Sequence, residues 1–337
     1  MSKTIRWGFM GCGKIASDFA NAMKLLPTGE HEIVAVAASD VKRAEEFASK
    51  FGVEYAFGSY DQIANCPEVD IVYINTLHPA HLQCAKQALN GGKAVLCEKP
   101  MTMNSKQLRE ISKLAREKGL FLMEGYWSRF FPIYDDVRHA LSDGSIGKPR
   151  FLQGSFGQQV DAFLARILRK ALGGGSLLDF GCYLVMITTM IFNGQRPETI
   201  AAVGQLNDEG VDIMDSITLR YKDGSVAQLM LSAELIMGQQ VAVFGTKGQL
   251  EVQKVFHHPT KLAINSKEIT HPLPEPNAEY NYCDSQGLMY ELQHVRECLL
   301  KGLKESPLMT LADSEVIMDI MDEIRRQVGV LYLEDAQ

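Results

Sequence analysis

The fold of the N-terminal half is decided by the stretch Ile5-Arg6-Trp7-Gly8-Phe9-Met10-Gly11-Cys12-Gly13-Lys14-Ile15-Ala16. Its first six residues form an apolar run that predicts a buried strand. A G-x-G-x-x-A pattern (Gly11, Gly13, Ala16) follows at once and opens a helical pattern. In this arrangement the first glycine permits a tight turn, the second lets a pyrophosphate approach the backbone, and the helix N-terminus offers N–H groups to the anion. The predicted dinucleotide-binding residues of this loop are Gly11, Cys12, Gly13, Lys14 and Ile15.

Apolar runs and amphipathic stretches alternate through the first 125 residues. The predicted strands are Ile5–Met10, Ile33–Ala37, Val69–Ile74, Ala94–Cys97 and Leu120–Met123. The predicted helices between them are Ala16–Leu26, Lys42–Phe51 and His81–Asn90. Repetition of strand, helix and strand builds a parallel sheet with helices on both faces. We therefore expect residues 1–125 to form an α/β domain, a doubly wound parallel sheet of the Rossmann type that binds a dinucleotide.

The pattern changes after Pro132. Helical periodicity predicts helices over 134–141, 177–192, 288–300 and 312–328. Apolar runs at 217–221 and 226–230 flank Asp223-Gly224, which is a strong hairpin signal, and a second hairpin joins 241–244 to 250–252. Consecutive hairpins give an antiparallel sheet. We expect residues 126–337 to form an α+β domain whose mainly antiparallel, open-faced sheet serves substrate binding and pairing with a second copy of the chain as a homodimer.

Length and composition exclude several classes of protein. The 337 residues exceed what one hydrophobic core usually serves, and 46% hydrophobic residues exclude disorder over most of the chain. A net charge of −7 argues against a nucleic-acid partner. Seven cysteines without a C-x-x-C pair fit neither a disulfide framework nor a zinc site. With no apolar leader and no stretch of about 20 apolar residues, we expect a soluble cytoplasmic protein without a membrane segment.

The end of the second predicted strand bears on the choice between NAD and NADP. NAD sites hold an acidic residue there that binds the ribose 2′-hydroxyl. This chain has Ala38 and Ser39 at the corresponding positions, and bases follow. Ser39, Lys42 and Arg43 could hold a 2′-phosphate, which predicts NADP. In the alternative interpretation the two bases are a solvated helix face and Asp40 binds the ribose.

Two further segments follow predicted strands and are expected to face the cofactor, because ligands of open α/β sheets bind beyond the carboxyl ends of the strands. The residues concerned are Thr76, His78, His81, Glu98 and Lys99. The two histidines have no third ligand at a suitable spacing, so we predict no metal site and favour hydrogen-bonding or packing roles. Taken alone, Lys99 is typical of a solvated surface lysine.

Three segments together carry a resemblance. They are Gly11-x-Gly13-x-x-Ala16, Glu98-Lys99-Pro100 and Gly173-Gly174-Gly175-Ser176-Leu177-Leu178-Asp179-Phe180-Gly181-Cys182-Tyr183. In this order they resemble the signatures of the glucose-fructose oxidoreductase, inositol dehydrogenase and rhizopine catabolism (Gfo/Idh/MocA) family, over almost the whole chain. The stretches 94–101, 121–132 and 294–307 are similar to a branch of dimeric dehydrogenases that use NADP and oxidise trans-dihydrodiols and D-xylose. The resemblance thus implies NADP and a homodimer.

The resemblance also implies roles for single residues. In the family the lysine of Glu-Lys-Pro contacts the nicotinamide ribose and substrate, and the Asp-x-Gly-x-(His or Tyr) motif supplies acid/base groups; these roles fall on Lys99, Asp179 and Tyr183. Removal of a hydroxyl proton needs a positioned base, and a tyrosine with the ordinary pKa near 10 needs a nearby cation to ionise. Without the resemblance, Tyr183 and Asp179 would be interpreted as a buried tyrosine and a helix cap.

By the same resemblance, Trp127, Phe156 and Tyr282 would line an apolar substrate pocket, although each could equally be a core residue. One departure concerns 161–170, which is more basic and apolar than in the similar branch, notably from Arg166 to Lys170. The leading hypothesis is an NADP-dependent dehydrogenase of vicinal diols or pyranose sugars. Two alternatives remain: an NAD-dependent dehydrogenase of another sugar or cyclitol, and a catalytically silent dinucleotide-binding regulator.

Overall fold

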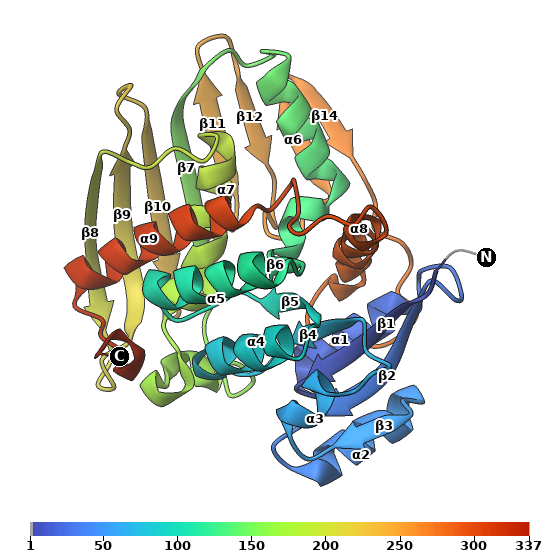
Figure 1. The fold of residues 1–337 in the computed structure, drawn as a ribbon. Coiled ribbons are helices and arrows are strands. Elements are labelled where there is room, and N and C mark those ends of the chain that lie inside the picture. Colours follow the sequence, from blue (N-terminus) through green and yellow to red (C-terminus); the bar gives the residue numbers. More distant parts are fainter. Residues whose placement is uncertain (1–2, 337) are drawn as a thin grey trace. The chain divides into compact units, whose positions relative to one another are not determined.

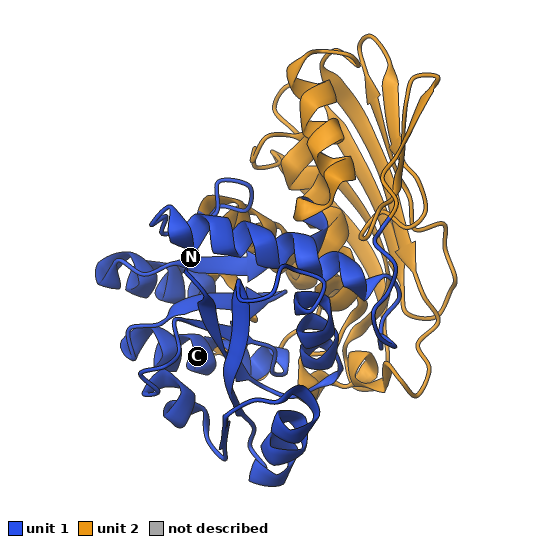
Figure 2. Ribbon diagram, turned by 90° about the vertical axis from the view of Figure 1, so that its right-hand side faces the viewer, with its two compact units in different colours: residues 1–102, 106–129, 273–311 blue, residues 103–105, 130–272, 312–337 orange. Residues whose placement is uncertain are grey.

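A computed structural model describes residues 3–336 and divides them into two compact units, which are described separately (Figure 2). The first unit comprises residues up to 102, 106–129 and 273–311. The second comprises 103–105, 130–272 and 312 onward. The division differs from the expected boundary between residues 125 and 126, because the segment 273–311 belongs to the first unit.

The first unit is built on a six-stranded parallel sheet in the order β3-β2-β1-β4-β5-β6. Its strands are β1 (Ile5–Met10), β2 (His31–Ala37), β3 (Tyr55–Phe57), β4 (Ile71–Ile74), β5 (Ala94–Glu98) and β6 (Leu122–Gly125). Strands β4 and β6 are buried throughout and β1 nearly so, as expected for a parallel sheet covered on both faces. The strand order reverses between β1 and β4, so a ligand is expected beyond the carboxyl ends of these two strands.

Helices follow the strands of this sheet in turn (Figure 1). They are α1 (Lys14–Met23), α2 (Val41–Phe51), α3 (Tyr60–Ala64), η1 (His78–Ala80), α4 (His81–Asn90), α5 (Ser105–Lys118, of which Ser105 belongs to the second unit) and η2 (Trp127–Phe130, of which Phe130 belongs to the second unit). The segment 273–311 adds η6 (Ser285–Gly287) and α8 (Leu288–Leu300). Helix α8 joins this unit because it packs on α1, and because Asp18 of α1 accepts the backbone N–H groups of Asn281 and Tyr282. The predicted helix 288–300 is confirmed.

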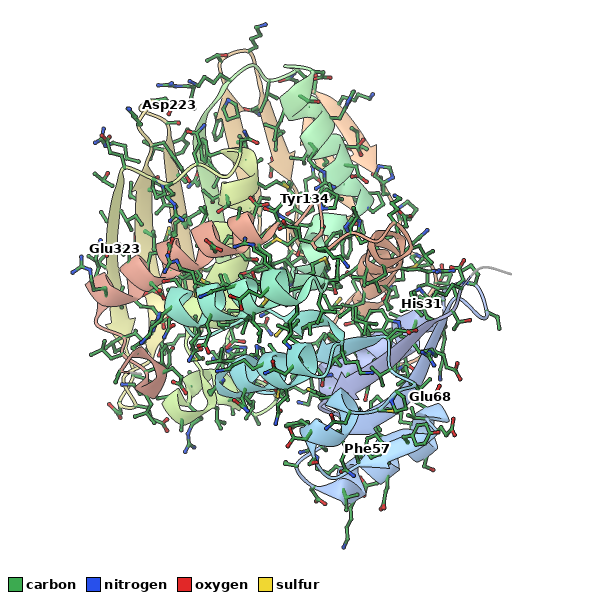
Figure 3. The ribbon with its side chains drawn as sticks, viewed as in Figure 1. His31, Phe57, Glu68, Tyr134, Asp223 and Glu323 are labelled. Carbon is green, nitrogen blue, oxygen red and sulfur yellow. The ribbon has the colours of Figure 1, made fainter. Side chains whose placement is uncertain are left out.

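The second unit contains an eight-stranded sheet in the order β14-β13-β12-β11-β7-β10-β9-β8. Its strands are β7 (Pro149–Gly157), β8 (Thr199–Leu206), β9 (Asp212–Arg220), β10 (Val226–Ser232), β11 (Val241–Gly245), β12 (Gln249–Val252), β13 (Lys261–Ile264) and β14 (Lys267–Thr270). All pairs are antiparallel except β7 with β10. The hairpin at Asp223-Gly224 is confirmed. Asp223, which is labelled in Figure 3, accepts the N–H of Ser225 in that turn.

The helices of this unit are α6 (Pro132–Ser142), η3 (Ala165–Leu168), η4 (Lys170–Leu172), η5 (Leu177–Gly181), α7 (Cys182–Ile191), α9 (Leu311–Val328, of which Leu311 belongs to the first unit) and η7 (Leu333–Ala336). Helices α6, α7 and α9 lie over one face of the sheet (Figure 1). Among the described residues, the stretch Lys170–Ile191 is long and apolar enough to cross a membrane by length and composition alone. Because 94% of its apolar window is buried inside the protein, it is a core helical segment.

The other face of this sheet carries apolar side chains. Val203, Met214, Met230 and Phe244 are exposed to 72%, 37%, 48% and 38%. On β9 and β10 the exposed positions alternate with buried ones such as Ile217. The exposed set therefore points away from the core, as expected for the open-faced sheet.

Candidate active site and cofactor-binding loop

The loop between β1 and α1 has the geometry that a pyrophosphate requires. Gly11 adopts φ +111°, and a Cβ there would lie 2.4 Å from Asn75 Oδ1. A Cβ on Gly13 would meet nothing within 4 Å, so the space beside this residue is open. Gly13 is the N-cap of α1 and provides no side-chain cap. The first-turn N–H groups of a helix have no intrahelical acceptor, so the loop fits an anion such as a pyrophosphate.

The segment after β2 places charged side chains of both signs beside this loop. Ala38 is buried, whereas Ser39, Lys42 and Arg43 are exposed. Burial raises the pKa of the Cys12 thiol, the positive charge of Arg43 lowers it, and the negative charges of Glu46 and Asp40 raise it. All three charged side chains therefore lie near the loop. Asp40 caps α2 by accepting the N–H of Lys42 at 3.0 Å. One oxygen of the Asp40 carboxylate, Oδ1, is therefore engaged by its own helix.

Two further predicted cofactor residues, Thr76 and His81, are joined directly. The ring of His81 is fully buried, with Nδ1 2.9 Å from the carbonyl oxygen of Pro100 and Nε2 3.0 Å from that of Thr76. His78 is buried and its ring lies 5.6 Å from that of His81. The two ring nitrogens of His81 each lie within hydrogen-bond distance of a carbonyl oxygen, so the ring lies between the end of β4 and the Lys99-Pro100 segment. Within residues 3–336, no three His, Cys, Asp or Glu side chains gather as metal ligands.

Glu98 fixes the segment that carries Lys99. Its Oε1 accepts the hydroxyl of Tyr73 at 2.6 Å, and its Oε2 accepts the N–H of Lys99 at 3.3 Å. Burial, with the charge of Glu98, holds the pKa of Tyr73 well above its usual range, so this hydroxyl remains a donor. Burial and Glu98 likewise raise the pKa of Glu291, a fully buried carboxyl of α8. Through these contacts Glu98 supports the backbone at Lys99. The peptide bond between Lys99 and Pro100 is cis.

In the second unit, Asp179 lies on η5 and is held by a guanidinium. Arg166 Nη2 donates to Asp179 Oδ1 at 2.5 Å, and Nη1 donates to Oδ2 at 3.1 Å. The side chain of Asp179 is 3% exposed, whereas that of Arg166 is 33% exposed. Both carboxylate oxygens are therefore fixed in direction. The basic segment that departs from the similar branch thus contributes a direct partner of the predicted acid/base motif.

Tyr183 follows on the first turn of α7, within an aromatic cluster of the second unit. Its ring centroid lies 5.3 Å from that of His257 and 6.3 Å from that of Phe156. Phe156 also stacks on His257 and on Phe180. An aromatic wall beside Tyr183 suits a ring-shaped substrate. Sequence reasoning missed His257, because no motif marks its position on the chain.

The two other predicted substrate residues, Trp127 and Tyr282, belong to the first unit. Trp127 is 8% exposed and lies on η2. The backbone N–H of Tyr282 is donated to Asp18 Oδ2 at 2.9 Å. The role of Asp18 in holding this segment was not predicted. A buried aspartate in α1 gives no sequence signal that it binds Asn281 and Tyr282, more than 260 residues away.

Comparison with known families agrees with this arrangement. Residues 5–126 match a model described as an oxidoreductase family with an NAD-binding Rossmann fold. Residues 134–251 match the Gfo/Idh/MocA C-terminal domain. The chain belongs to the Gfo/Idh/MocA family of oxidoreductases. Its cofactor is therefore a nicotinamide dinucleotide, which the β1–α1 loop fits.

Individual relatives in this family cover nearly the whole chain. Trans-1,2-dihydrobenzene-1,2-diol dehydrogenase of Xenopus laevis is 43% identical over 97% of this chain and 99% of its own length. The enzymes of the same name from Sus scrofa and Homo sapiens are 43% and 40% identical over 98% of this chain and 99% of their own length. KijD10, a 3-ketoreductase from Actinomadura kijaniata in complex with NADP, is 25% identical, with a TM-score of 0.83 over 98% of this chain and 100% of its own.

Proposed function

We propose that this protein is an NADP-dependent dehydrogenase that oxidises a CH–OH group of a vicinal diol or a pyranose sugar. The observation that carries the proposal is 40–43% identity to trans-1,2-dihydrobenzene-1,2-diol dehydrogenases, which extends over at least 97% of the chain. The aromatic cluster beside Tyr183 supports a ring-shaped substrate. Trp127, Phe156 and Tyr282 are proposed to contact it.

NADP is proposed over NAD on the charges at the end of β2. Positions 38 and 39 carry no carboxylate, and Asp40 uses its Oδ1 atom to cap its own helix. Arg43, together with Lys42 and Ser39, supplies donors for a 2′-phosphate. A charge-assisted hydrogen bond contributes about 1.5 to 3 kcal/mol, so a preference of about tenfold or more follows from one such bond.

The nicotinamide ring, when bound, supplies the hydride acceptor. The proposed proton acceptor is the Tyr183 hydroxyl, and the proposed role of Lys99 is to hold the reacting hydroxyl and favour the phenolate. Asp179, fixed by Arg166, is proposed to orient the substrate. These three assignments rest on the sequence motifs and on the family resemblance.

We also propose a homodimer formed through the exposed sheet face, and a cytoplasmic location. Val203, Met214, Met230 and Phe244 give that face apolar side chains that a second copy of the chain would cover. Light scattering at micromolar concentration is expected to give twice the mass of one chain. A monomeric mass would contradict the dimer and leave the proposed reaction untouched.

The experiment that tests the function is a spectrophotometric screen of the wild-type protein with NADP and with NAD. The substrates are trans-1,2-dihydrobenzene-1,2-diol, D-xylose, glucose and inositol. We expect NADPH formation with the diol or xylose. Turnover only with NAD and glucose or inositol would favour an NAD-dependent dehydrogenase of another sugar or cyclitol. Binding of the dinucleotide without turnover of any substrate would favour a silent regulator.

A further inference from the structure

Asp212, at the start of β9, is a buried carboxylate that contacts the acid/base segment of the second unit. Its exposed fraction is 1%. Its Oδ2 accepts the hydroxyl of Ser176 at 2.7 Å and the backbone N–H of Leu177 at 2.5 Å. Those two residues open η5, which carries Asp179 and runs into α7 with Tyr183. Asp212 thus caps this helical segment from a strand that is distant in sequence.

A bulge in β9 brings Asp212 to this position. Gln205 of β8 pairs with Met214, but its neighbour Leu206 pairs with Asp212, so Ile213 is an extra residue in the ladder. The extra residue places Asp212 on the same face as Asp215, although the two are three positions apart. Both are buried, whereas Met214 between them is exposed.

The glycine loop before η5 is packed against the same carboxylate. Gly175 adopts φ +124°, and a Cβ there would lie 2.5 Å from Asp212 Oδ1 and 2.8 Å from the hydroxyl of Tyr332. A Cβ on Gly174 would lie 2.4 Å from the carbonyl oxygen of Ile167. The loop therefore has no room to shift on either side. Gly174 and Gly175 are required by these close approaches.

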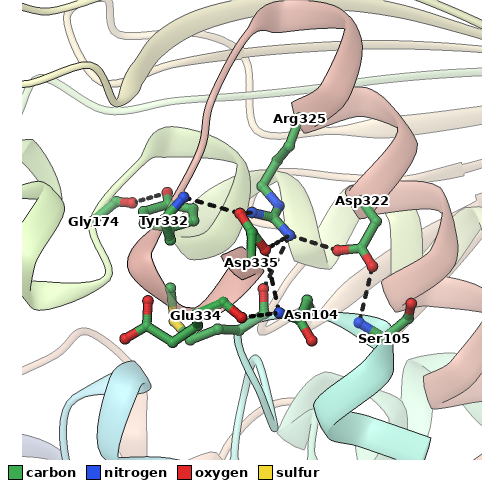
Figure 4. A network of polar contacts seen from close by, with 9 residues as sticks. Asn104, Ser105, Gly174, Asp322, Arg325, Tyr332, Glu334 and Asp335 are labelled. Carbon is green, nitrogen blue, oxygen red and sulfur yellow. Dashed lines mark hydrogen bonds and ion pairs between the residues drawn. The ribbon is translucent and has the colours of Figure 1, made fainter. Parts of the chain in front are cut away.

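Tyr332 holds the loop from the C-terminal segment. Its buried hydroxyl donates to the carbonyl oxygen of Gly174 (Figure 4). Its backbone N–H is donated to Asp335 Oδ2 at 2.9 Å. Asp335 pairs with Arg325 at 2.8 Å, and Arg325 Nη2 donates to the carbonyl oxygen of Met103 at 3.1 Å. The C-terminal segment is thus a fixed support for the loop.

The pKa shifts of the buried groups around Asp212 are consistent with these contacts. Among the described residues, no donor forms a hydrogen bond to either carboxyl oxygen of Asp215. Burial and the charge of Asp212 raise the pKa of Asp215, so Asp215 is protonated and donates to Asp212. Burial, with the charge of Asp212 and despite Arg325 nearby, raises the pKa of Tyr332. Burial also raises the pKa of Asp212, and the hydrogen bonds that it accepts from Ser176 and Leu177 act in the opposite direction.

We propose that Asp212 and Tyr332 are positioning residues for the dehydrogenase reaction: they fix the Gly173–Gly175 loop and the start of η5, and through them Asp179 and Tyr183. The proposal rests on the proposed function. Reacting groups must be held within a fraction of an ångström, and a misplacement of about 1 Å reduces turnover about 100-fold. A loop held on both sides meets this requirement better than one held by its own backbone.

The test compares Asp212→Ala, Asp212→Asn and Tyr332→Phe in the full chain. Tyr221→Phe is the matched control, because Tyr221 is a buried tyrosine of the same unit whose hydroxyl has no hydrogen-bond partner among the described residues. For each variant, kcat is calculated from the concentration of protein that binds NADPH, so that unfolded protein does not lower it. Hydrogen–deuterium exchange of a peptide spanning 173–183 reports the loop independently of activity.

We expect Asp212→Ala to lower kcat about 10- to 100-fold and to speed exchange of the 173–183 peptide, with the Kd for NADPH within about twofold of wild type. Asp212→Asn keeps an oxygen acceptor and should restore kcat to within about threefold of wild type. Tyr332→Phe loses one neutral hydrogen bond and should lower kcat about two- to tenfold. Tyr221→Phe should change neither readout.

The proposal would be overturned if kcat and exchange were both unchanged in Asp212→Ala and Tyr332→Phe. It would also be overturned by faster exchange with an unchanged kcat, because the two residues would then contribute to stability alone. If Asp212→Ala does not fold, kcat and the exchange of the 173–183 peptide are compared in Tyr332→Phe and Ser176→Ala instead, and the same outcomes support or overturn the proposal. A wild-type protein that oxidises none of the substrates contradicts the proposed function instead. The exchange data would still decide whether Asp212 and Tyr332 hold the loop.

Discussion

Arg166 holds both carboxylate oxygens of Asp179, at 2.5 and 3.1 Å. The pair lies within one unit, and the arginine comes from a segment that carries no recognised motif. A guanidinium fork fixes the plane of a carboxylate, which a lysine would not do. Asp179 is therefore better suited to orient a substrate than to move freely as a proton carrier.

Arg166→Met should lower kcat/KM about tenfold or more, because the Asp179 carboxylate loses its fixed direction and its charge partner. Arg166→Lys should recover only part of this loss, since a single ammonium replaces the fork. Steady-state kinetics with the best diol measure the effect. Arg169→Met is the matched control: Arg169 lies in the same segment but pairs with Glu209 at the surface. Equal losses in the two methionine variants would contradict a specific role for Arg166.

Arg43→Ala should weaken NADP binding about tenfold or more and leave NAD binding within about twofold, because only NADP carries the 2′-phosphate. Isothermal titration calorimetry with both dinucleotides measures the two constants. Lys50→Ala, in the last turn of the same helix, is the control and should change neither. Wild-type protein that binds NAD as tightly as NADP would contradict the proposed preference.

His31 predicts a specific sensitivity to acid. Trp7 Nε1 donates to His31 Nδ1 at 3.1 Å, which requires a neutral ring (Figure 3 labels His31). Burial, with the nearby charge of Arg296, lowers the pKa of His31 to about 4. The unfolded chain binds this proton near pH 6.5 and the folded chain does not, so the free energy of unfolding falls as the pH drops from about 6.5 to 4.

We therefore expect His31→Gln to lose less stability than the wild type between pH 7 and 4.5, by about 1 to 2 kcal/mol. Urea unfolding at the two pH values measures the difference. His139→Gln serves as control, because His139 is 77% exposed. If wild type and His31→Gln show the same pH dependence, His31 is not buried in its neutral form.

Local patterns predicted the elements well. The β9–β10 hairpin follows from Asp223-Gly224, and α8 begins and ends where the apolar periodicity does. The three-residue strand β3 was not predicted, since it is too short for a periodicity. The parallel pairing of β7 with β10 joins residues 75 positions apart, such as Phe151 and Val226. The placement of α8 in the first unit depends on α1. Neither leaves a local signal.

The candidate site shows the same limit. The G-x-G-x-x-A pattern predicted the glycine loop from its residue types and spacing, whereas only the family resemblance pointed to Lys99, Asp179 and Tyr183. The supports of these residues could not be predicted. Asp212 reaches Leu177 through a bulge, and Tyr332 reaches Gly174 from the C-terminal segment. Such contacts depend on packing between distant segments, which one sequence does not display.

The most direct test of the account is single-turnover NADPH formation by wild type and Tyr183→Phe with the same diol and saturating NADP. The phenylalanine keeps the ring and removes the proposed proton acceptor. General base catalysis contributes about 10² to 10⁴-fold, so the rate of hydride transfer should fall by about that factor while the Kd for NADP stays within about twofold. Tyr221→Phe should match the wild type. A Tyr183→Phe variant that keeps more than about half of the wild-type rate would show that Tyr183 is a packing residue and contradict the account.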